Sequence, residues 1–222
     1  MKKTLLSLCS GALVLAALST SFPQSAKADI FEFHDPQGRF QVTFPDRWRA
    51  TSNQKADDVL VVKAPGEHEY VECRVRVRPD NRYAVYPANY APNIQHVAYS
   101  REFWENYLGD YNDVHVDAFH DDAGMGRGFA SWADVSFTTA QGPLMEKRGI
   151  MFVSLYENNA FIIDCSAQKA AYEKWRPSFL SFIKSIEFTP ITTPFRSGYY
   201  RNFMGDQPLQ IRGASEHDVD IY

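Results

Sequence analysis

The sequence has few cysteines and, after its first 28 residues, no long apolar run. Its 222 residues include only three cysteines, and none of them belongs to a C-x-x-C motif. A thioredoxin-like redox centre is therefore not expected. Downstream of residue 28, no apolar run reaches the roughly 18 residues of a membrane-spanning helix. The sequence predicts no transmembrane helix in that part of the chain.

The sequence also lacks the short motifs that mark common enzyme classes. It contains no G-x-S-x-G, no H-E-x-x-H, no phosphate-binding Walker loop and no dinucleotide fingerprint. Gly124, Gly126 and Gly128 alternate, but they precede a predicted strand, whereas phosphate loops precede a helix. These glycines therefore predict a hairpin turn. We expect no catalytic residue and no cofactor.

The first 28 residues have the pattern of a secretory signal peptide. Two lysines precede an apolar run over residues 5–18, and Ala26-Lys27-Ala28 places small side chains just before Asp29. The run is shorter than the roughly 20 residues of a stable membrane span. Cys9 follows a bulky leucine, which does not suit a lipoprotein cleavage site. We expect an exported protein, periplasmic or secreted, that begins near Asp29.

Basic residues are scarce outside this leader. The whole chain holds 23 Lys and Arg against 27 Asp and Glu. Three of the lysines lie within residues 1–28, which contain no acid, so residues 29–222 keep 20 basic residues and a net charge of −7. Affinity for nucleic acid or for an anionic membrane surface depends on clustered Lys and Arg. Neither is an expected partner.

The two cysteines outside the leader both lie in predicted strands. Cys73 alternates with apolar residues within 70–78, and Cys165 shares a face with the apolar residues of 161–167. An even number of cysteines in an oxidising compartment favours a disulfide between them. Two buried free thiols are the alternative. A bridge that closes so long a loop would stabilise the fold by about 4–5 kcal/mol.

Periodicity and turn residues predict strands, a helix, a strand meander, a second helix and a last short strand. Hairpins are expected at 31–35 with 38–44 and at 59–64 with 70–78, a polar loop at 49–58, helices at about 92–108 and 168–184, consecutive strands at 114–120, 128–138, 145–156 and 160–167, and a final strand at 186–188. The apolar run from Ile150 to Leu155 predicts an interior strand covered on both faces. This order indicates an α+β fold with an antiparallel sheet.

The chain divides into a leader, one domain and an extension. The domain is expected over residues 29–188, which is enough chain for a substantial core. Residues 189–222 contain several prolines and glycines that break any period, so we expect a C-terminal extension that is partly flexible.

Two segments of the domain resemble the PsbP-like family. Residues 38–48, Gly-Arg-Phe-Gln-Val-Thr-Phe-Pro-Asp-Arg-Trp, are similar to the family's opening pattern, and residues 179–188 are similar to its closing helix-to-strand segment. The resemblance covers about residues 30–188. It implies an α/β/α sandwich, an antiparallel sheet packed between helices, and usually no enzymatic activity. The family includes PsbP, an extrinsic subunit of photosystem II, and a related Ran-binding factor, but no partner-binding residue of either is matched here.

One polar cluster could bind a metal ion. Within Asp113–Asp122, strand alternation places His115 and Asp117 on one face, about 6.6 Å apart along the strand. Imidazole and carboxylate at this spacing could chelate one ion. His120 faces the other way unless a bulge intervenes. A solvated polar face on an edge-like strand is the alternative. The sequence thus leaves open a metal-dependent periplasmic enzyme or a metal-binding protein that uses His115 and Asp117.

Two further features could contact a protein partner. Arg74, Arg76 and Arg78 share one strand face and could bind carboxylates or phosphates, although pairing with neighbouring acids is the alternative. The extension carries aromatic residues that could order on a partner or pack back onto the domain, namely Phe195, Tyr199, Tyr200 and Phe203. We therefore expect a non-catalytic binding or assembly domain of the cell envelope with a protein partner. A stability or stress factor of the periplasm without a fixed ligand is a third alternative.

Overall fold

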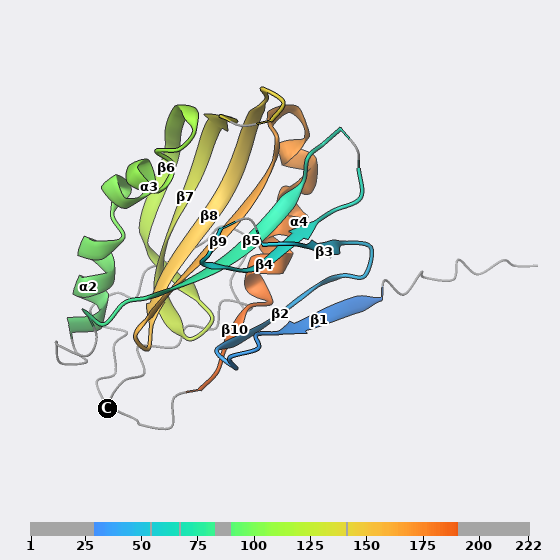
Figure 1. The fold of residues 1–222 in the computed structure, drawn as a ribbon. Helices are drawn as coiled ribbons and strands as arrows, with labels where there is room; N and C mark the ends of the chain where they lie inside the picture. Colours follow the sequence, from blue (N-terminus) through green and yellow to red (C-terminus); the bar gives the residue numbers. More distant parts are fainter. Residues whose placement is uncertain (1–28, 54, 67, 83–89, 141, 191–222) are drawn as a thin grey trace, which may run out of the picture.

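The computed structural model describes residues 29–190, except for 54, 67, 83–89 and 141. Within these residues the strands form two antiparallel sheets, one with the order β1-β2-β10 and one with the order β3-β4-β5-β9-β8-β7-β6 (Figure 1). The predicted leader, residues 1–28, and the aromatic residues of the extension lie outside the described part of the chain.

Apart from β3 and the division of the first helix, the elements occur in the predicted order. The strands are β1 (Ile30–His34), β2 (Phe40–Pro45), β3 (Arg49–Thr51), β4 (Asp58–Lys63), β5 (Glu72–Pro79), β6 (Asn112–Met125), β7 (Gly128–Thr138), β8 (Glu146–Tyr156), β9 (Asn159–Gln168) and β10 (Glu187–Phe188). The helices are α2 (Ala91–Ala98), α3 (Arg101–Tyr107) and α4 (Tyr172–Lys184), the last preceded by a 3-10 turn, Lys169–Ala171. β3 lies where the polarity of residues 49–58 predicts a loop.

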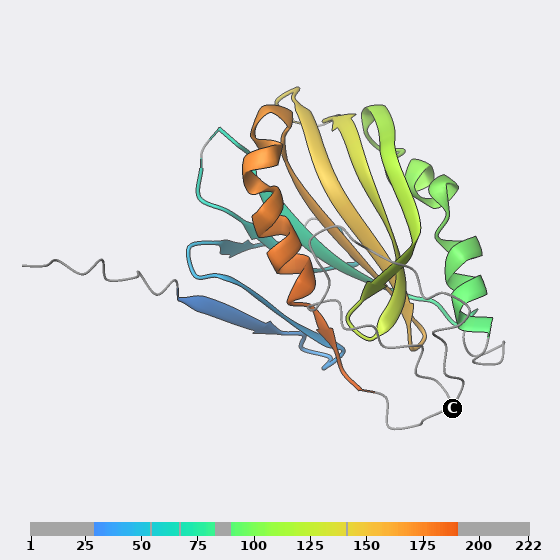
Figure 2. The same ribbon diagram turned by 180° about the vertical axis from the view of Figure 1, so that it is seen from behind.

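The large sheet lies between two layers. α2 and α3 cover one face, and α4 lies on the opposite face together with the small sheet (Figures 1 and 2). β8 is central, and its alternate side chains enter the two cores: Phe152 packs toward α4, and Val153 packs toward α2 and α3. The prediction of an interior strand covered on both faces is confirmed. The described residues form the α+β sandwich that the sequence predicts.

The single helix predicted over 92–108 is two helices in the structure, because the chain breaks at Tyr99 and Ser100. The Tyr99 carbonyl accepts a hydrogen bond from Ser131 Oγ at 2.7 Å, and its hydroxyl donates to Asp80 Oδ2 at 2.6 Å. Ser100 is extended, with ψ of −179°, so the helical hydrogen bonds cannot continue through it. Val97 of α2, which helical periodicity places on the apolar side, is 75% exposed.

The β6–β7 hairpin turns at Gly126, as predicted. Gly126 has a φ of +57°, and a Cβ at this position would lie 2.8 Å from the Phe188 ring. The turn thus needs glycine both for its left-handed backbone and for its close approach to β10. The adjacent Arg127 donates from Nε to the Phe188 carbonyl at 3.2 Å and pairs with Glu187 at 2.9 Å. These bonds join the hairpin of the large sheet to the small sheet.

The predicted disulfide is present. Cys73 on β5 and Cys165 on β9 stand directly opposite each other, and both are fully buried in the core beneath α4. The alternative of two free thiols is therefore not what the structure shows. The bridge joins strands whose cysteines are 92 positions apart in the sequence.

Candidate functional site

The predicted row of arginines lies partly inside the protein. Arg74 and Arg76 are only 4% and 2% exposed, and only Arg78 reaches the surface. Arg76 Nε donates to Asp58 Oδ1 at 2.8 Å, and its guanidinium lies 5.1 Å from the centre of the Tyr107 ring. Strand alternation correctly places the three arginines on one face, but α3 covers that face. Arg74 and Arg76 therefore do not form an exposed contact surface.

The buried arginines belong to an ionic cluster between the sheet and α3. Its buried or half-buried members include three cations and three carboxylates: Arg74, Arg76, Lys147, Asp58, Glu72 and Asp164. Lys147 Nζ lies 2.9 Å from Glu72 Oε1. Burial opposes ionisation of Glu72, but the charges of Lys147 and Arg74 outweigh it and lower the pKa of the carboxyl.

Tyr107 closes this cluster from α3. Its hydroxyl donates to Asp164 Oδ2 at 3.4 Å. Burial, and next the Asp164 carboxylate, raise the pKa of Tyr107 well above its usual value, so the phenol stays neutral. The six charges of the cluster balance within it, which is what a buried ionic network requires. The cluster holds α3 on the sheet. Arg74 and Arg76 therefore pair with neighbouring acids, which is the alternative that the sequence left open.

The two residues of the possible metal site lie on β6, at one edge of the large sheet. His115 and Asp117 are both exposed, and Asp117 accepts a hydrogen bond from Ser136 Oγ at 2.6 Å. The pairing of β6 with β7 shifts register between Val116 and Ala118, so regular alternation stops there. Among the described residues, no three His, Cys, Asp or Glu gather where they could hold a metal ion.

His120 takes part in a different contact. Its ring stacks on the ring of Trp132, with 4.5 Å between the ring centres and 13° between the planes. The bulges of β6 bring the two residues opposite each other on neighbouring strands. A bulge does intervene on β6, and the register then places His120 on the same face of the sheet as His115, where its ring lies against Trp132.

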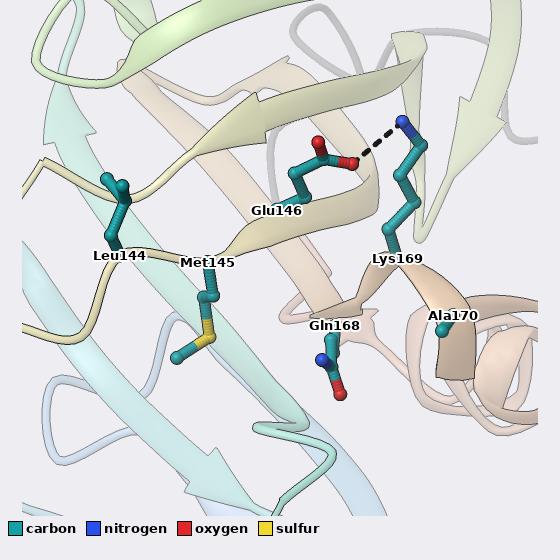
Figure 3. Close-up of a pocket in the computed structure, with 6 residues that line it drawn as sticks. All are labelled: Leu144, Met145, Glu146, Gln168, Lys169 and Ala170. Atoms are coloured by element: carbon teal, nitrogen blue, oxygen red, sulfur yellow. Dashed lines mark hydrogen bonds and ion pairs between the residues drawn. The ribbon is translucent and has the colours of Figure 1, made fainter.

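A hollow that joins apolar and charged groups lies at one end of β8 and β9. This Leu144 pocket is about 480 Å³ in volume and is lined by the residues that Figure 3 draws, Leu144, Met145, Glu146, Gln168, Lys169 and Ala170. Met145 and Gln168 point the same way from neighbouring segments, and Glu146 and Lys169 face each other as an ion pair at 3.0 Å. Leu144 is 78% exposed, more than any other large apolar residue among the described ones.

The segment before β5 contacts one of the residues that line this pocket. Gln168 donates its backbone N–H to the Glu69 carbonyl at 2.8 Å, and the next residue, Tyr70, is exposed. The sequence patterns discussed above do not predict the Leu144 pocket. The available signal was the apolar pair at 144–145 directly after the Gly142-Pro143 turn, where a polar residue is usual.

No helix among the described residues is long and apolar enough to cross a bilayer. A scan of the sequence against protein-family models finds no match, and neither does a search of curated proteins.

Comparison with solved structures finds proteins of similar structure. CyanoP, the cyanobacterial PsbP of Synechocystis sp. PCC 6803, superposes with a TM-score of 0.51 and 9% identity over 76% of this chain and 98% of its own. The Saccharomyces cerevisiae Ran-binding protein Mog1p scores 0.45 with 8% identity over 72% of this chain and 95% of its own. LpqN of Mycobacterium tuberculosis, involved in cell envelope biogenesis, scores 0.42 with 12% identity over 73% and 91%. The likeness to CyanoP shows that the chain has the PsbP-like fold, as its sequence resemblance implies.

Proposed function

We propose that this protein is an exported, non-catalytic binding or assembly module of the cell envelope and that it acts by contacting a protein partner. The observation that carries the proposal is the Leu144 pocket, where an exposed leucine stands beside an open hollow with an ion pair in its wall. Apolar groups rimmed by charges are typical of protein contact surfaces. The low identity to CyanoP limits that comparison to the fold.

Two features support export. Residues 1–28 have the order of a secretory leader, with basic, apolar and small-residue parts. Cys73 and Cys165 form a fully buried disulfide, a bond that forms and persists in oxidising compartments such as the periplasm. The aromatic residues of the extension, around 195–203, would add a second contact with the same partner.

Affinity capture with single-residue variants tests this proposal. The processed protein is used as bait in envelope extract, and bound proteins are quantified by mass spectrometry. Leu144→Asp should reduce capture of a stoichiometric partner by about tenfold or more, because burial of a leucine side chain contributes roughly 1.5–3 kcal/mol. Val97→Asp is the matched control, since Val97 is equally exposed but lies on α2.

Two results would argue against this contact. Equal capture by Leu144→Asp and by the unaltered protein would remove the pocket from the interface. Equal loss with Val97→Asp would show a general effect of added charge. Replacement of Tyr199 and Phe203 by serine in the full chain tests the extension separately, and unchanged capture would exclude it.

A further inference from the structure

The break between α2 and α3 leaves a small pocket on the α3 side of the large sheet. Its volume is about 180 Å³. Ala160 and Ile162 of β9 are buried and line it, as do Tyr99 and Phe103 on either side of the helix break. Sites for whole drug-sized ligands usually exceed about 300 Å³, so this pocket has room for one apolar side chain.

Two arginines line the same pocket. The side chains of Arg78 and Arg82 are each 44% exposed. Arg82 binds Asp80 and the Tyr99 hydroxyl, and Arg78 binds Asp57 through Nε. The described residues offer no hydrogen-bond acceptor to the two terminal nitrogens of Arg78. A guanidinium with donors left over can bind a further carboxylate.

We propose that this pocket binds the acidic end of the chain's own extension, residues 216–222. One apolar side chain of that segment enters the cavity, and a neighbouring carboxylate pairs with Arg78 or Arg82. The segment reads Glu-His-Asp-Val-Asp-Ile-Tyr, with three acids, three apolar residues and no Lys or Arg. An apolar hollow beside two arginines is complementary to this composition in both shape and charge.

The chain is long enough to make this contact. Thr189 is held near the β8–β9 turn, because its carbonyl accepts a hydrogen bond from the Tyr156 hydroxyl at 3.3 Å. The same turn contacts the pocket's wall, since Asp80 donates its N–H to the Asn158 carbonyl at 2.7 Å. Residues 191–215 then separate Pro190 from the acidic segment, and 25 extended residues span up to about 80 Å. That reach far exceeds the thickness of one sheet and one helix layer.

The proposal is independent of the Leu144 pocket and goes beyond the proposed function. In this proposal the acidic end of the extension binds the domain of the same chain. The aromatic residues near 195–203 then belong to a segment attached to the domain at both of its ends. A segment held at both ends loses less entropy when a partner binds it.

Site-specific photo-cross-linking of the full processed chain tests the contact. A benzophenone amino acid replaces Pro79, an exposed residue that lines the pocket, and the dilute protein is irradiated, digested and mapped by mass spectrometry. We expect cross-links within one chain to residues 216–222. The pair Arg78→Ser and Arg82→Ser should lower their yield roughly tenfold, as loss of a charge-assisted contact predicts. Arg47→Ser, an exposed arginine outside the pocket, should leave the yield unchanged.

A second pair of variants guards against misfolding of the arginine variants. Asp218→Asn with Asp220→Asn lies outside the domain and should lower the cross-link yield by a similar factor. Absence of cross-links to 216–222 would overturn the proposal. So would cross-links that join two chains, which would make a second copy the occupant, or a yield that neither pair of variants changes.

Discussion

At the scale of single residues, Gln95 explains how α2 is held on the sheet. β7 stops pairing with β8 at Ala130 and Ser154. Where the pairing ends, Gln95 Nε2 donates to the Val153 carbonyl at 3.2 Å, and its Oε1 accepts from the Leu155 N–H at 2.7 Å. A buried side-chain amide thus provides the donor and the acceptor that a neighbouring strand would otherwise provide.

Replacement of Gln95 should therefore destabilise the fold. Gln95→Met keeps the length of the side chain but leaves the Val153 carbonyl and the Leu155 N–H without their partner. Each buried, unsatisfied backbone group costs about 1–3 kcal/mol, so the free energy of unfolding should fall by about 2–4 kcal/mol. Urea titration followed by circular dichroism measures the change.

Asn93→Met is the control for this substitution, because Asn93 is exposed on the same helix. It should change stability by less than about 0.5 kcal/mol. If Gln95→Met were as mild as the control, water or a shifted strand would have to satisfy the β8 backbone.

At the scale of elements, the disulfide joins two strands that already pair. Cys73 and Cys165 face each other across β5 and β9, so the bridge reinforces an existing ladder. Both residues are fully buried, so a reductant reaches the bond only when the strands open.

Removal of the bridge should destabilise the protein without changing its fold. The double variant Cys73→Ala and Cys165→Ala frees a long loop in the unfolded chain, and the free energy of unfolding should fall by about 2–5 kcal/mol. The measurement is the denaturant midpoint of the oxidised protein and of the variant. Identical midpoints would show that the bridge contributes nothing to equilibrium stability.

At the scale of the whole molecule, several carboxylates make the fold sensitive to acid. Burial opposes ionisation of Asp35, but hydrogen bonds from the Arg39 side chain and backbone outweigh it and lower the pKa of the carboxyl. Burial likewise opposes ionisation of Asp57 and Asp80. Hydrogen bonds from Arg78 to Asp57 and from Arg82 to Asp80 outweigh it, and the pKa of each carboxyl is lowered. Glu72 adds a fourth lowered pKa.

These lowered pKa values set the direction of the pH dependence. Each carboxylate stabilises the folded state above its unfolded pKa near 4, and that contribution is lost as the pH falls through the lower folded pKa. The thermal midpoint should therefore change little from pH 7 to about pH 5 and fall steeply below about pH 4.

Asp35→Asn should reduce the steepness of this acid transition, because it removes one of the lowered carboxyls. Asp46→Asn, an exposed carboxylate after β2, should leave the transition unchanged. Calorimetry between pH 2.5 and pH 7 measures both variants. A midpoint that rises on acidification would contradict the assigned direction.

The sequence by itself determined the features that depend on near neighbours in the chain. Alternation placed Cys73 and Cys165 on apolar faces and Arg74, Arg76 and Arg78 on a common face. The continuous apolar run at 150–155 identified the central strand. Turn residues located the hairpins at Asp35–Gly38 and Gly126. These signals are local, since side-chain direction along a strand and the backbone freedom of glycine need no distant contact.

Only the tertiary structure decided what covers each face. Periodicity cannot show that α3 buries Arg74 and Arg76, or that contacts of Tyr99 with Ser131 and Asp80 break the predicted helix. The two pockets likewise lie where segments far apart in the sequence meet. Alternation assigns a residue to a face, but burial, charge balance and cavity shape depend on which elements pack against that face, and this packing is set by the fold as a whole.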